Sequence, residues 1–345
     1  MTYALGTSAV AMRSAPLLLV DVETEEGITG HSYLFCYVRE AAPAIIAMID
    51  AAAKGCVGDR LAPADLWAKL AKRFRLIGVQ GIVRMAMAAI DVAAWDALAK
   101  AAGVPLATLL GGAPRRIPAY NSCGLGLMAP EALADEAVKL LAGGFTAIKL
   151  RLGHPTLQAD MAAVHAVRRV IPDRVVLMVD YNQALGVAEA LRRGQALDQE
   201  GVYWLEEPIR HDDYGGAAEL VRTLKTPIQI GENFSLVTSM EAAIAAKAAT
   251  YVMPDLERIG GVTGWRQAAA LAAAHRLEMS SHLYPEASVH LLAVTPTCHW
   301  LEYMDWANAI VEEPLRIEDG FAIPSTRPGT GLSWRRDAVA RYRFA

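Results

Sequence analysis

The sequence predicts an α/β fold, a modified TIM (β/α) barrel that carries an N-terminal α+β capping domain. From residue 117 onward, short apolar runs alternate with Ala- and Leu-rich segments of helical periodicity, which indicates a parallel sheet covered by helices. Each run ends in a polar residue, and the carboxyl ends of barrel strands are where catalytic side chains lie. A length of 345 residues suits one large barrel or two domains.

Eight apolar runs are the candidate barrel strands, and their last residues lie 20 to 29 positions apart. This interval is about the length of one strand, one helix and two loops. The barrel is therefore expected to span residues 113–312. The eight runs end at Ser122, Arg151, Asp180, Glu206, Glu232, Asp255, His282 and Glu302.

The N-terminal third has a different pattern. Residues 16–37 contain two β-rich runs around EEGITG, which predicts a hairpin, and helical segments follow over 39–102. We expect residues 1–112 to form the capping domain and residues 313–345 to pack back on it.

Composition excludes several classes of protein. Hydrophobic residues make up 54%, and the formal net charge is only −4 with charges spread along the chain, so neither nucleic acid nor a membrane is an expected partner. No apolar run reaches the roughly 18 to 20 residues of a membrane span, and we expect a cytoplasmic protein. The cysteines are widely separated and form no CxxC pair, so we expect four buried small hydrophobes, Cys36, Cys56, Cys123 and Cys298.

Three consecutive runs end in a carboxylate, at Asp180, Glu206 and Glu232, with gaps of 26 residues each. One such residue could simply cap the next helix. Three carboxylates at neighbouring strand ends would repel one another unless a cation neutralised them, and all-oxygen ligation suits Mg²⁺. The spacing therefore predicts a magnesium site.

The next two strand ends carry Asp255 and His282. A carboxylate beside an imidazole fixes its tautomer and raises its basicity, so we interpret the pair as a general base, with a structural histidine as the alternative. Lys149 and Arg151 alternate on one strand and face the barrel interior together, where a substrate carboxylate or an internal salt bridge would balance them. Glu302 is a candidate acid, provided that burial keeps it protonated.

These residues occur in motifs that resemble the enolase superfamily, specifically its mandelate racemase subgroup, over nearly the whole chain. The motifs are GHSYLF, VDYNQAL, QEGVYWLEEP, GENF, MPDLERIGGVTGW, MSSHLYPEASVHLLA and TPTCHWLEYMD. The resemblance implies abstraction of the proton α to a carboxylate, giving an enediolate held by Mg²⁺. It implies that His282 with Asp255 is the R-face base and Glu302 the acid. It also places Lys149, Ser122 and Asn182 near the substrate carboxylate and the metal.

Two departures from the family pattern matter. The family has a second Lys, the S-face base, where this chain has Arg151. Deprotonating an arginine side chain at pH 7 costs roughly 7 to 9 kcal/mol, against about 4.6 for lysine. Met1 falls where relatives enter their flexible capping loop, so we expect either an upstream start or a cap without its first strand.

The resemblance also locates the residues around the substrate. Leu5, Thr7 and Met12 match the loop positions that close over the substrate in the family. The distal pocket would contain Leu5, Met12, Tyr37, Leu283 and Met304, which are mostly apolar and favour an apolar or aromatic 2-hydroxy acid.

Three functions follow. The main prediction is a racemase-like enzyme whose inversion is in doubt because of Arg151. The first alternative is an acid-sugar dehydratase of the same superfamily, for which one base suffices. The second is a metal-binding pseudoenzyme. By analogy with relatives, we expect a homo-oligomer, an octamer or a dimer.

Overall fold

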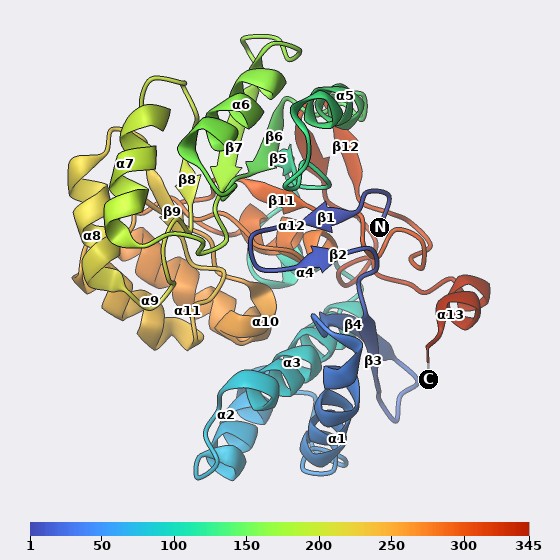
Figure 1. Ribbon diagram of the computed structural model, residues 1–345. Helices are drawn as coiled ribbons and strands as arrows, with labels where there is room; N and C mark the ends of the chain where they lie inside the picture. Colours follow the sequence, from blue (N-terminus) through green and yellow to red (C-terminus); the bar gives the residue numbers. More distant parts are fainter. Residues whose placement is uncertain (345) are drawn as a thin grey trace.

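The computed structural model describes residues 1–344. Figure 1 shows a barrel of strands inside a ring of helices, with a smaller group of helices and two strands below it. The amino terminus lies at the side of the barrel near β1, Leu5–Gly6, and the carboxyl terminus lies beside the smaller part. This arrangement confirms the predicted fold class.

The barrel strands are parallel neighbours in the order β11, β5, β6, β7, β8, β9, β10. Their carboxyl ends therefore gather at one end of the barrel. The strands are β5 Ile117–Asn121, β6 Ala147–Arg151, β7 Val176–Asp180, β8 Leu205–Glu206, β9 Ile228–Ile230, β10 Tyr251–Val252 and β11 Leu301–Tyr303.

The expected seventh strand, LEMSSH, is not a continuous strand. It forms isolated parallel bridges, which pair Met279 with both neighbouring segments and His282 with Asp255. Ser280 N donates to Val252 O at 2.8 Å, so the segment still fills the gap between β10 and β11. The pairing ends where the two residues after His282 turn into the left-handed region, with φ of 53° and 49°.

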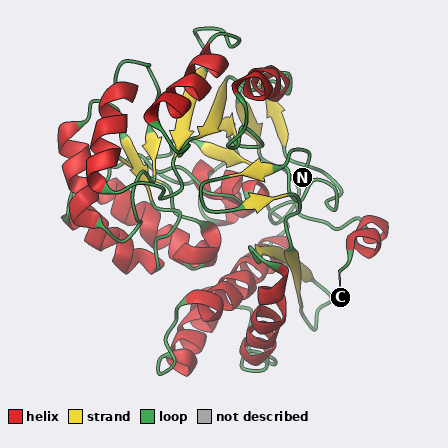
Figure 2. Ribbon diagram, in the orientation of Figure 1, coloured by secondary structure: helices red, strands yellow, loops and turns green. Residues whose placement is uncertain are grey.

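Helices cover the outside of the barrel (Figure 2). α5, for example, buries an apolar stripe of Leu133, Ala137 and Leu140, whereas α12 is buried over its whole length. The helices are α5 Pro130–Leu141, α6 Leu157–Arg168, α7 Val187–Leu197, α8 Tyr214–Thr223, α9 Leu236–Ala245, α10 Leu256–Ile259, α11 Gly261–Ala274 and α12 Pro285–Ala293.

The smaller part is built on α3, Gly81–Ala101, which is buried over most of its length. The hairpin predicted within residues 16–37 is formed by β3, Leu17–Glu23, and β4, Thr29–Phe35, and it packs on α3. Gly30 is required at this contact, because a Cβ there would overlap the carbonyl oxygen of Ala93 in α3. The remaining elements of this part are α1 Ala42–Ala53, α2 Pro63–Phe74 and the short 3₁₀ helix η1 Arg39–Ala41; the one-turn helix α4 Leu106–Leu109 follows α3 and packs against both α3 and α12.

The C-terminal segment contacts both parts of the molecule. Its hairpin, β12 Arg316–Glu318 and β13 Phe321–Ile323, adds to the edge of β5 in antiparallel fashion. Further along, before α13 Arg336–Tyr342, Trp334 Nε1 donates to Asp21 on β3 at 2.9 Å.

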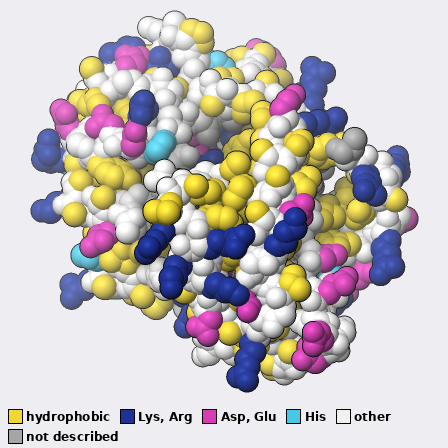
Figure 3. All heavy atoms as spheres, turned by 90° about the horizontal axis from the view of Figure 1, so that it is seen from below, with side chains coloured by type: hydrophobic (Ala, Val, Ile, Leu, Met, Phe, Trp, Pro, Cys, Tyr) yellow, Lys and Arg dark blue, Asp and Glu magenta, His cyan; other side chains and the backbone are white. Residues whose placement is uncertain are grey.

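The surface bears both signs of charge, and Figure 3 shows them interspersed over the face seen from below. Within the described residues, no helix is long and apolar enough to span a membrane. All four cysteines are free, but only Cys36 and Cys123 are buried. The expectation of four buried cysteines was therefore wrong for Cys56 and Cys298, which are partly exposed.

Candidate active site

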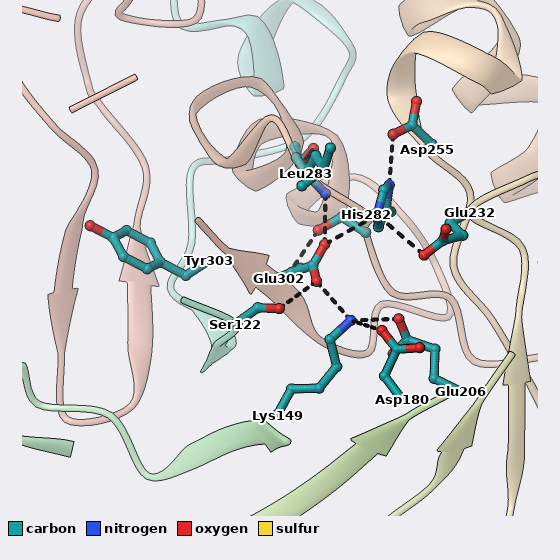
Figure 4. Close-up of polar contacts among 12 residues, drawn as sticks. Ser122, Lys149, Asp180, Glu206, Glu232, Asp255, His282, Leu283, Glu302 and Tyr303 are labelled. Carbon is teal, nitrogen blue, oxygen red and sulfur yellow. Dashed lines mark hydrogen bonds and ion pairs between the residues drawn. The ribbon is translucent and has the colours of Figure 1, made fainter. Parts of the chain in front are cut away.

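The three predicted carboxylates converge at the carboxyl end of the barrel. Asp180 ends β7, Glu206 ends β8, and Glu232 follows β9 by two residues. One oxygen from each lies within 4.8 Å of the others (Figure 4). Gly231, with φ of 138°, makes the turn before Glu232, where a Cβ would lie 2.9 Å from Met253 N.

This donor set fits Mg²⁺. All three groups are carboxylates, the hard oxygen ligands that this ion prefers. Burial and the neighbouring carboxylates raise the pKa of Glu206 to about 8, although Lys149 opposes the shift. The cluster therefore holds more negative charge than its protein partners neutralise, and a divalent cation would relieve that excess.

Lys149 lies among the acids, fully inside the barrel. Its Nζ is 2.5 Å from Glu206 Oε1, 3.2 Å from Asp180 Oδ2 and 2.9 Å from Glu302 Oε1. Burial lowers the pKa of this amine, but the surrounding carboxylates outweigh burial and hold the pKa well above its ordinary value. Lys149 is therefore a fixed positive charge at neutral pH.

His282 and Asp255 form the predicted pair. His282 Nδ1 lies 2.7 Å from Asp255 Oδ2, while Asp255 Oδ1 accepts the backbone N–H groups of Glu257 and Arg258 at the start of α10. This orientation places the Nδ1 proton toward Asp255 and turns Nε2 into the site, 3.3 Å from Glu232 Oε2. Burial lowers the pKa of His282, but Glu232, Glu302 and Asp255 raise it to about 10.

The charged groups around Glu302 favour its ionised form. Burial alone would raise its pKa, as the sequence argument assumed, but the charges of Lys149 and His282 lower it well below its ordinary range. Its Oε1 accepts from Ser122 Oγ at 2.7 Å, and its Oε2 accepts from Leu283 N at 2.9 Å. Glu302 accepts hydrogen bonds in this arrangement, and its role as an acid stays a prediction.

Arg151 is buried at the end of β6, but it is engaged with the loop after β5. It donates to the carbonyl oxygens of Ser122 and Gly124 and to the Ser122 hydroxyl. These acceptors are neutral and do not balance its positive charge, so a substrate carboxylate as the balancing partner stays a prediction. Within residues 1–344, no carboxylate oxygen lies within 4.0 Å of its nitrogens.

The loop residues fall into two groups. Thr7 closes its own turn, because its hydroxyl accepts from Val10 N at 3.0 Å, and it does not reach the carboxylates. Asn182 lies beside the cluster, and its Nδ2 donates to Asp180 Oδ2 at 3.1 Å. The five residues of the expected distal pocket belong to one apolar cluster or pack against it: Leu5, Met12, Tyr37, Leu283 and Met304.

Some supporting residues were missed in the sequence. Asn233 Nδ2 donates to both oxygens of Glu207, and Arg258 Nη1 donates to Asn233 Oδ1 at 2.6 Å and to Glu232 O at 3.0 Å. These contacts brace the loop that carries Glu232. The only indication in the sequence was that Glu207, Asn233 and Arg258 lie within the motifs QEGVYWLEEP, GENF and MPDLERIGGVTGW. Ser8, which donates to Tyr181 O at 2.8 Å and attaches the β1–β2 loop (Leu5–Gly6 and Ala11–Met12) to the barrel, had no signal.

Comparisons with known proteins agree with this geometry. Residues 2–111 match the mandelate racemase / muconate lactonizing enzyme N-terminal domain, and residues 132–338 match the enolase C-terminal domain-like family. The chain is 34% identical to a 3,6-anhydro-α-L-galactonate cycloisomerase of Streptomyces coelicolor, over 93% of this chain and 90% of the relative. It is 32% identical to an L-talarate/galactarate dehydratase of Salmonella typhimurium, over 93% and 81%.

A solved structure is also similar. An enolase from Bradyrhizobium, complexed with magnesium and mandelic acid, is 42% identical with a TM-score of 0.95, over all of this chain and 95% of that one. Together with the carboxylate cluster, these relatives establish Mg²⁺ as the cofactor and an enzyme as the class of protein. The chain belongs to the enolase superfamily, in its mandelate racemase and muconate lactonizing enzyme group.

Proposed function

We propose that the protein dehydrates a 2,3-dihydroxy carboxylate to a 2-keto acid. One observation carries this proposal: the site presents a single side chain built to accept a proton, His282. Arg151, at the position of the family's second base, donates to three oxygens at 2.6 to 2.9 Å. Dehydration needs one base, whereas inversion of the α carbon needs one on each face.

In the proposed reaction, the neutral form of His282, which a cation beside Glu232 would favour by offsetting that charge, takes the α proton at Nε2. The electron pair of that C–H bond moves toward the substrate carboxylate. The bond to the β-hydroxyl then breaks, and the departing oxygen takes the proton from His282 and leaves as water. The enol that remains rearranges to the 2-keto acid. Asp255 holds the Nδ1 proton throughout, so that Nε2 always faces the substrate.

Asp180, Glu206 and Glu232 hold the metal in this proposal, and Lys149 adds a positive charge where negative charge develops. When bound, Mg²⁺ supplies Lewis-acid stabilisation of the charge on the substrate carboxylate. The names of the two curated relatives support this proposal, since one is a dehydratase and the other a cycloisomerase, and neither is a racemase.

A second candidate is proton exchange or racemisation of an apolar 2-hydroxy acid. Two observations favour it: the apolar character of Leu5, Leu283 and Met304 at the positions expected for the distal pocket, and the mandelic acid bound to the Bradyrhizobium relative. An aryl 2-hydroxy acid has no β-hydroxyl to lose. The two candidates therefore differ in the products that they predict.

The test is a panel of aldonates, aldarates and aryl 2-hydroxy acids incubated with the Mg²⁺ enzyme in D₂O. We expect 2-keto acid from at least one 2,3-dihydroxy acid, detected as a semicarbazone and by ¹H NMR, and no product with His282→Asn. Racemisation of an aryl acid without keto acid from any substrate would instead support the second candidate. Arg193→Met is a control, because that buried arginine pairs with Asp160 outside the site.

A further inference from the structure

We propose that Arg151 is a positioning residue that directs the hydroxyl of Ser122 toward Glu302. The guanidinium is 3% exposed at the end of β6. Its Nη1 donates to Ser122 O at 2.6 Å and Gly124 O at 2.9 Å, and its Nη2 donates to Ser122 Oγ at 2.7 Å. A single planar group therefore holds both the backbone and the side chain of Ser122.

These contacts fix the direction of the Ser122 hydroxyl. Arginine has donors and no acceptor, so the hydroxyl oxygen must accept from Arg151 and its one hydrogen is free for another group. Ser122 is fully buried, and Glu302 Oε1 lies 2.7 Å from its Oγ. The hydrogen bonds therefore run in one direction, from Arg151 through Ser122 to Glu302.

Ser122 completes the support of Glu302. Lys149 Nζ lies 2.9 Å from Oε1, and Leu283 N donates to Oε2 from the other side. Figure 4 shows the Glu302 carboxylate at the centre of these donors, with His282 next to it. Ser122 adds a second donor on Oε1, so the carboxylate keeps its orientation between Lys149 and the base.

The loop between β5 and β6 has a conformation that places its carbonyl groups toward Arg151. Gly124 and Leu125 both adopt left-handed backbone conformations, with φ of 63° and 45°. Leu125 N donates to Glu136 at 2.7 Å, so an acid fixes the loop on one side while Arg151 fixes the carbonyls on the other. A lysine would keep the charge but would lack the planar fork that reaches three oxygens at once.

A double-mutant cycle tests the inference, whose kinetic readout rests on the proposed function. The variants are Ser122→Ala, Arg151→Gln and the two combined, measured with the best substrate of the panel. We expect each single change to lower kcat about 10- to 100-fold with KM changed less than about threefold, the size of effect that supporting residues show. Since Arg151 acts through Ser122, the double variant should fall less than about threefold below the worse single variant.

The inference is overturned if the effects multiply in the double variant, or if the Arg151→Gln enzyme has wild-type kcat. Arg151→Lys should recover only part of the loss, and full recovery would show that charge alone matters. The thermal midpoint of every variant is compared with that of Arg193→Met, which loses a buried arginine outside the site. Loss of folding without loss of kcat in the folded fraction would also contradict a positioning role.

A crystal structure of Arg151→Gln separates failure of this inference from failure of the proposed function. If the wild-type enzyme makes no keto acid, the proposed dehydration fails, but the geometry still decides the role of Arg151. The inference predicts that Ser122 Oγ moves away from Glu302. A folded variant that retains the 2.7 Å contact between Ser122 and Glu302 would refute it.

Discussion

Replacing Asp255 by Asn tests the base directly while disturbing the fold little. Asp255 Oδ1 accepts two backbone N–H groups at the start of α10, and Asn caps a helix as well as Asp does. The other oxygen lies 2.7 Å from His282 Nδ1, and there an amide N–H would replace a charged acceptor. A lost hydrogen bond to a charged group is worth about 1.5–3 kcal/mol, which corresponds to a kcat lower by about 10- to 150-fold.

The pH profile of kcat adds a second readout. Asp255 is one of the groups that raise the pKa of His282, so its loss should lower that pKa. His282 would then remain neutral down to a lower pH, so the acidic limb of the pH profile of kcat should shift to lower pH. Asp213→Asn, which replaces another helix-capping aspartate that accepts from Gly216 N, should leave both kcat and the limb unchanged. An Asp255→Asn enzyme with wild-type kcat, or with its acidic limb moved toward alkali, would refute the reasoning.

Three further predictions follow from the structure. Chelation of Mg²⁺ should abolish turnover and lower the thermal midpoint. Mg²⁺ at 100 times its Kd should add about 2.7 kcal/mol to the free energy of unfolding, and an unchanged thermal midpoint would contradict the metal site. Mg²⁺ should also lower the pKa of His282 from about 10, because it takes up the charge of Glu232, as measured by NMR titration of the imidazole. Gly30→Ala should lower the free energy of unfolding by about 3 kcal/mol, because its methyl group would overlap Ala93 O. The control Gly186→Ala, which has open space around it, should change that free energy by less than about 1 kcal/mol, both measured by denaturant titration.

The barrel was predictable because parallel strands repeat one pattern, an apolar run that ends in a polar residue. The residues at which the strands end were less predictable. Glu232 lies beyond β9, and the segment before His282 forms bridges rather than a strand, because pairing depends on the register of both neighbours. The hairpin of β12 and β13 was not predicted, because runs of three residues carry too little periodicity.

The candidate active site was likewise predictable only in part. Spacing alone brought the three carboxylates together, because equivalent strand ends meet in a barrel. The lowered pKa of Glu302 could not be inferred in this way, since it depends on Lys149 and His282, which lie at the ends of other barrel segments. The contacts of Arg151 likewise depend on a loop conformation at Gly124 that no local pattern specifies.

The central claim is that one base, His282, serves a dehydration. The most direct measurement is ¹H NMR in D₂O of the wild-type Mg²⁺ enzyme with each enantiomer of an aryl 2-hydroxy acid and with a matched panel of 2,3-dihydroxy acids. The single-base account predicts α-proton exchange for one enantiomer only, and keto acid from at least one dihydroxy acid. Equal exchange of both enantiomers, with no keto acid from any dihydroxy acid, would contradict it.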